Sequence, residues 1–143
     1  MPFNEPFMKR LLLLIVVAAF FSGSCKRAIE KKKEDMIMAA ITDGVWIVEQ
    51  YFEGANNISS VFLNYDFRFY NNGSVTGTNG ADSSSGTWSG DASNYSISSQ
   101  FPTAGDPIKK LNGVWKIKDS YWDYVKAEMT TGNGINILHL KKK

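Results

Sequence analysis

The feature that most constrains the fold is a period-two alternation of side chains that begins after Gly44. Successive side chains of a β-strand point to opposite faces, so this period predicts strands that are buried on one side. Two segments show it most clearly and are expected to line the core. One face of the first holds Trp46, Val48, Gln50 and Phe52, and one face of the second holds Val61, Leu63, Tyr65, Phe67 and Phe69.

Six further strand-sized segments follow at short intervals, separated by turn residues such as Asn72-Gly73 and Asn79-Gly80. They are residues 74–78, 86–89, 95–99, 111–118, 121–129 and 135–141. No helical period lies between them, which favours an antiparallel meander. The predicted fold is all-β: an eight-stranded antiparallel up-and-down barrel over residues 44–143, preceded by a short helix. A flattened sandwich is the alternative.

The N-terminal 24 residues have the pattern of a secretory signal peptide. Lys9 and Arg10 precede an apolar run over residues 11–21, and small residues then lead to Cys25. The run is too short to span a bilayer as a helix. The stretch Phe21-Ser22-Gly23-Ser24-Cys25 resembles a lipobox, which implies that Cys25 is acylated and anchors an exported cell-envelope lipoprotein in the outer membrane, on its periplasmic or surface face. Met8 is an alternative to Met1 as the translation start.

Cys25 is the only cysteine, so the domain cannot contain an internal disulfide bond. Residues 25–43 are interpreted as the lipidated cysteine, a charged tether and a short helix. The helix is expected over residues 29–42, because Ile29, Met36, Ile37, Ala40 and Ile41 approximate helical spacing and are expected to lie against the barrel.

The sequence contains no pattern that predicts catalysis, a cofactor or a metal site. His139 is the single histidine and alternates with Leu138 and Leu140, so it is expected to face outward. Glu49 and Asp66 are expected to pair with Arg68 or a lysine. The near-balance of 16 Lys and Arg against 14 Asp and Glu gives no electrostatic argument for nucleic acid. We therefore expect a protein that is not an enzyme.

A Gly-x-Trp motif occurs at Gly44, Gly86 and Gly113, each near the start of a predicted strand. The first copy, preceded by a short helix, is similar to the lipocalin motif that opens the first strand. The order of Phe62–Phe69, Asn72-Gly73, Ser85–Ser89 and Leu111–Trp115 resembles the small lipocalin-like lipoproteins of Bacteroidetes-type bacteria. In lipocalins a basic residue near the last strand covers the first tryptophan, and here the choice is among Lys141, Lys142 and Lys143.

This resemblance implies a barrel that holds a small apolar ligand. The inward aromatic set also includes Tyr95, and Gln50 is expected to offer a polar group on the same face. The candidate ligand-binding residues are Trp46, Gln50, Tyr65, Phe67, Trp88 and Trp115. The alternative is a filled barrel that binds or inhibits another protein, as small β-barrel lysozyme inhibitors do, through its two longest connections, residues 54–60 and 100–110.

Overall fold

The structure is a computed structural model that describes residues 25–143; the predicted signal peptide, residues 1–24, lies outside the described residues. The chain divides into two units, Met1–Lys33 and Glu34–Lys143. Residues 25–42 are helical, so the helix begins earlier than predicted and includes the charged tether. Among residues 25–143, no helix has the length and apolar character needed to cross a membrane.

Only part of the expected apolar stripe of this helix packs on the barrel. Ile41 is buried in the core and Met38 packs against it. Met36 is exposed, so the prediction that it faces the barrel is wrong. Ile29 belongs to the first unit, and its contact with the barrel stays a prediction. The core therefore holds the helix only through its last turns.

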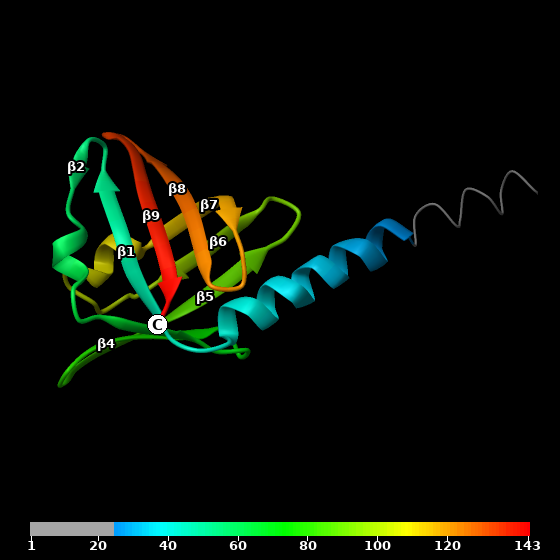
Figure 1. Cartoon of the computed structure of the whole chain (residues 1–143), viewed down its shortest axis with the longest axis horizontal. Helices are drawn as coiled ribbons and strands as arrows, with labels where there is room; N and C mark the ends of the chain where they lie inside the picture. Colours follow the sequence, from blue (N-terminus) through cyan, green and yellow to red (C-terminus); the bar gives the residue numbers. More distant parts are fainter. Residues whose placement is uncertain (1–24) are drawn as a thin grey trace, which may run out of the picture. The chain divides into compact units, whose positions relative to one another are not determined.

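Eight antiparallel strands in sequence order form the predicted up-and-down barrel, and the pairing of the first with the last closes it (Figure 1). A two-residue strand, β2, is an addition at the end of β1. The strands are β1 Trp46–Glu53, β2 Asn56–Asn57, β3 Asp66–Phe69, β4 Ser74–Asn79, β5 Asp82–Asp91, β6 Ser96–Gln100, β7 Gly113–Ser120, β8 Tyr124–Thr131 and β9 Gly134–Lys142. Two 3₁₀ turns interrupt the connections: η1 Ser59–Phe62 and η2 Ile108–Leu111.

A β-bulge in β1 overturns the prediction that Gln50 faces the core. The register with β9 shifts between Val48 and Gln50, which inserts one extra residue into β1. A bulge of this kind moves every later side chain to the other face. Tyr51 is consequently fully buried, whereas Gln50 is exposed.

The second predicted strand, residues 61–69, begins in the 3₁₀ turn η1 and becomes a strand only at Asp66. Val61 and Leu63 are exposed, and Phe62 between them is buried, the reverse of the prediction. Asn64 has a positive φ of 70°, which ends the turn before β3 begins at Asp66. The extended alternation holds only from Tyr65, which is half-buried, onward.

Two other aromatic residues depart from the predicted inner face. Tyr95 is 54% exposed and has a positive φ of 47°, because it belongs to the β5–β6 turn and not to β6. Phe52 lies after the bulge and is only half-buried. Neither residue lines the barrel interior.

The three Gly-x-Trp motifs share one structural role. Each tryptophan is buried and donates its indole N–H to a main-chain carbonyl of an earlier segment. The bonds are Trp46 Nε1 to Ile41 O (2.8 Å), Trp88 Nε1 to Tyr70 O (2.9 Å) and Trp115 Nε1 to Leu111 O (3.0 Å). Since β1 and β7 run in opposite directions, Trp46 and Trp115 close opposite ends of the barrel, beneath the helix and η2 respectively.

Candidate binding site in the barrel interior

The barrel interior contains a small apolar cavity with a volume of about 40 Å³. Its single polar wall is Ser99, whose hydroxyl donates to the main-chain oxygen of Leu111 at 2.6 Å. No buried side-chain polar atom of residues 25–143 lacks a hydrogen-bond partner. The cavity is lined by Phe67, Phe69, Ile97, Ser99, Phe101, Leu111, Trp115, Val125, Ala127, Leu138 and Leu140.

Two of the six predicted ligand-binding residues, Phe67 and Trp115, line this cavity. Tyr65 lies beside Phe67 with their ring centroids 6.3 Å apart, and Trp88 meets Phe69 edge to face at 5.4 Å. Trp46 borders a separate hollow beneath the helix. The six residues are therefore divided between the interior, its edges and, for Gln50, the outer surface.

Sequence reasoning missed the connection between β6 and β7, residues 101–112, as a wall of the cavity. Residues 100–110 were predicted to be a surface loop and Leu111 to begin a strand, but Phe101, Ile108 and Leu111 are buried within the core. The sequence signal for this burial is that apolar side chains occur in a segment that is otherwise rich in Pro and Gly. The connection closes the end of the barrel that carries Trp115.

The same connection is fastened to β1 by two contacts, both made by Lys110. Tyr51 donates its hydroxyl to the main-chain oxygen of Lys110 at 2.8 Å. The ammonium of Lys110 meets Glu53 Oε1 at 2.7 Å, and this contact raises the pKa of Lys110. These contacts hold η2 against the rim of the barrel.

We expect the Lys110–Glu53 ion pair to act as a fastener of modest strength. Both side chains are partly exposed, so Glu53→Gln should cost less than about 1 kcal/mol of global stability. Its effect should be local: faster hydrogen exchange at the amides of Lys110 and Asn112, which donate within η2. Glu49→Gln, which breaks the surface pair with Lys141, is the matched control and should leave those amides unchanged. Equal exchange in both variants would show that the ion pair does not fasten η2.

The outer face of β1, β8 and β9 carries several ionisable groups. His139 faces outward, as predicted, in an open hollow with Lys126. Partial burial lowers the pKa of His139, and the charge of Lys126 lowers it further. Glu49 pairs with Lys141 at 3.6 Å and Asp66 pairs with Lys143 at 2.9 Å, which confirms lysine partners for both. Residues 25–143 contain no group of three or more residues suited to hold a metal ion.

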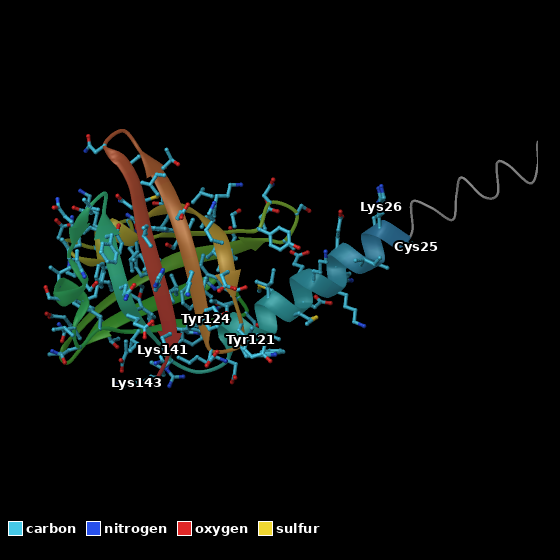
Figure 2. All side chains as sticks on the ribbon, turned by 45° about the horizontal axis from the view of Figure 1, so that its top comes forward. Cys25, Lys26, Tyr121, Tyr124, Lys141 and Lys143 are labelled. Carbon is cyan, nitrogen blue, oxygen red and sulfur yellow. The ribbon has the colours of Figure 1, made fainter. Side chains whose placement is uncertain are left out.

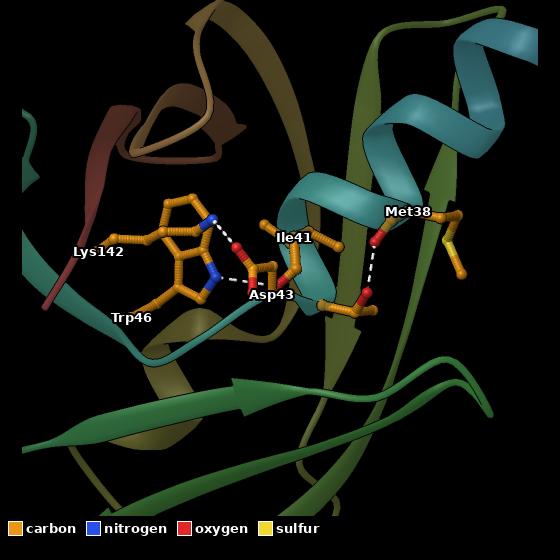
Figure 3. A network of polar contacts seen from close by, with 6 residues as sticks. Met38, Ile41, Asp43, Trp46 and Lys142 are labelled. Atoms are coloured by element: carbon orange, nitrogen blue, oxygen red, sulfur yellow. Dashed lines mark hydrogen bonds and ion pairs between the residues drawn. The ribbon is translucent and has the colours of Figure 1, made fainter.

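A network at the Trp46 end joins the helix, β1 and the last strand (Figure 3). Lys142 Nζ lies 5.4 Å from the centroid of the Trp46 ring and also meets Asp43 Oδ2 at 3.0 Å. The Thr42 hydroxyl donates to Met38 O at 2.7 Å, within the helix. Lys142 is thus the basic residue that covers the first tryptophan.

Comparison with solved structures identifies the architecture. A DUF4847 family protein from Bacteroides vulgatus matches with a TM-score of 0.56 and 11% identity, over 75% of this chain and 97% of that one. Japanin from Rhipicephalus appendiculatus, bound to cholesterol, matches with a TM-score of 0.50 and 10% identity, over 72% of this chain and 76% of that one. The fold is lipocalin-like. Neither a protein-family model nor a curated protein matches the sequence of this lipocalin-like chain.

Proposed function

We propose that this protein is a lipid-anchored protein of the cell envelope whose lipocalin-like barrel binds a small apolar molecule. The observation that carries the proposal is the interior cavity, whose walls are apolar at every position except Ser99. Because the Ser99 hydroxyl already donates its proton to Leu111 O, this side chain offers a ligand an acceptor oxygen but no free donor. A ligand with few hydrogen-bonding groups suits such a site, since a buried unpaired polar group is costly.

The closed barrel has little room for that ligand. Small-molecule sites usually have volumes of roughly 300–1,000 Å³, whereas this cavity has about 40 Å³. Binding therefore requires movement of a wall, and the connection 101–112 is the wall that is not part of the sheet. Displacing Phe101 and Leu111 enlarges the cavity without breaking a strand pairing.

The proposal is tested by filling the cavity. Ala127 is buried on β8 and lines the cavity, so Ala127→Leu adds three carbon atoms to the site. Overpacking of this kind costs about 1–3 kcal/mol of stability. We expect wild-type protein to bind the uncharged fluorophore N-phenyl-1-naphthylamine with one site, and Ala127→Leu to weaken that binding by about tenfold or more, equivalent to about 1.4 kcal/mol.

The matched control is Ala92→Leu, which adds the same carbons in the β5–β6 turn and should bind as wild type does. Cholesterol, which Japanin holds, provides a larger competitor. Absence of probe binding by the wild-type protein, or equal binding by Ala127→Leu, would contradict an interior site.

A filled barrel that binds another protein is the second candidate, and the small size of the cavity favours it. In that case residues 54–60 and the exposed part of the connection, Pro102–Asp106, are the available surfaces, because Phe101, Ile108 and Leu111 are occupied in the core. The second candidate predicts no probe binding, together with a specific partner in envelope extract. Replacing residues 102–106 with Gly and Ser should abolish capture of that partner.

The anchor is proposed on Cys25, an exposed free thiol at the first described residue. Two or more acyl chains give stable membrane attachment, whereas one gives weak attachment. We expect cells that express the full chain to incorporate labelled palmitate into it and to retain it in the membrane fraction. Cys25→Ala should remove the label; a labelled Cys25→Ala protein would refute acylation at this residue.

A further inference from the structure

The turn between β7 and β8 exposes two large aromatic side chains. Tyr121 is 67% exposed and Trp122 is 48% exposed. The chain has four tryptophans, and the other three are at most 5% exposed. Tyrosine and tryptophan combine an apolar ring with a polar group, and this makes them common where a protein meets the interface of a lipid bilayer.

This turn lies at the end of the barrel that the last turns of the helix, residues 34–42, adjoin (Figure 2). Tyr121 and Ile37, from the helical segment that precedes β1, line the same hollow. The amide of Lys142 donates to Asp123 O at 2.8 Å, so the end of β9 lies at the same place. In sequence, Thr42 is only 17 residues after Cys25. Because this connection is short, a surface near Thr42 stays close to the anchor and therefore has a high effective concentration there.

The charges around the turn favour a neutral lipid surface over an anionic one. Asp119 and Asp123 flank Tyr121 and Trp122 in sequence. The lysines that end β9 are engaged by carboxylates: Lys141 by Glu49, Lys142 by Asp43 and Lys143 by Asp66. Attraction of these three lysines to anionic headgroups is therefore a minor contribution, and contact through the aromatic rings should depend little on salt.

We infer that the Tyr121–Trp122 turn is a membrane-contact site that inserts into the interfacial region of the zwitterionic lipid surface in which Cys25 is anchored. The inference rests on the proposed anchoring of Cys25. It assigns an orientation to the domain: the Trp46 end faces the lipid, and the end closed by Phe101 and η2 faces away. A ligand or partner would then approach the movable connection 101–112 from the aqueous side.

The test uses the single cysteine as a chemical anchor, so that its outcome does not depend on whether cells acylate Cys25. Residues 25–143 are coupled through Cys25 to phosphatidylcholine vesicles that contain a maleimide-bearing lipid. Because Trp122 is the exposed tryptophan, its emission reports the environment of the turn. We expect a blue shift on coupling, quenching by lipids brominated close to the headgroup, and little change of either signal between low and high salt.

The control moves the reporter to the other end of the barrel. Trp122→Phe removes the exposed tryptophan, and Asn133→Trp in that background places one in the β8–β9 turn. Coupled Asn133→Trp/Trp122→Phe protein should show neither the shift nor the quenching. Absence of both signals for coupled Trp122 would overturn the membrane-contact site, and so would equal quenching of the two reporters. Absence of palmitate labelling of the wild-type protein in cells would instead refute the anchor alone.

Discussion

Replacing Trp46 with alanine is expected to lower the free energy of unfolding by about 3–5 kcal/mol, the usual cost of truncating a fully buried aromatic side chain. Trp46 is 0% exposed, donates to Ile41 O at 2.8 Å and lies beneath the ammonium of Lys142. The substitution therefore removes buried apolar area and the bond that fastens the helical segment to the barrel. Denaturant unfolding followed by far-ultraviolet circular dichroism measures the change.

Two variants separate the contributions at this position. Trp46→Phe keeps an aromatic ring but leaves Ile41 O without its donor, and should cost less than the alanine variant, about 1–3 kcal/mol. Trp122→Ala, at an exposed position, should change stability by no more than about 0.5 kcal/mol. If Trp46→Ala lowered the free energy of unfolding by less than Trp122→Ala does, the helix and the first strand would not be joined through this indole.

The closed barrel could be predicted from the sequence because its strands are short, regular and separated by strong turn residues. Asn72-Gly73 and Asn79-Gly80 lie in the turns before β4 and β5, and Gly73 and Gly80 both have positive φ. Glycine adopts these angles without steric cost, so the turns are encoded locally. Gly86, by contrast, is required by a tertiary contact, since a Cβ there would lie 2.2 Å from Gln100 O.

The errors share a cause: each depends on pairing between distant segments. The bulge in β1 is set by its register with β9, nearly 90 residues later, and the local alternation from Trp46 to Phe52 contains no sign of it. The period alone likewise places Leu63 on the inner face, although Leu63 is exposed and Asn64, with its positive φ, breaks the strand. A one-residue slip reverses every subsequent face, so Tyr51 and Gln50 exchanged places.

The candidate site was predictable in composition but not in volume. Sequence periodicity placed Phe67 and Trp115 in the interior, where they line the cavity. Whether the interior is hollow depends on Phe101 and Leu111. Phe101 comes from residues 100–110, whose prolines and glycine predict a surface loop, and Leu111 lies at the predicted start of a strand. Packing of a connection into a barrel end depends on tertiary contacts, such as the bond from Tyr51 to Lys110 O, that leave no local pattern.

Tyr51 should make the stability of the barrel fall steeply above pH 10. Burial raises its pKa to about 12, against a smaller lowering by Asn136, and the charges of Glu53 and Asp106 add to the increase. Below pH 10 the phenol is protonated in both the folded and the unfolded state, so its contribution is fully present. Between pH 10 and pH 12 the unfolded state loses the proton while the folded state keeps it, which costs about 2–3 kcal/mol.

Tyr51→Phe isolates this contribution, because the lysines titrate alike in both proteins and cancel in the difference. At pH 7 the variant should be less stable than wild type by about 1 kcal/mol, since Lys110 O loses its donor. The variant has no phenol to ionise, so the order should reverse as the pH approaches 12. Unfolding curves at pH 7, 9, 10, 11 and 12 measure the crossover. Parallel pH profiles for the two proteins would contradict a buried, neutral Tyr51, and with it the fastening of η2 through this hydroxyl.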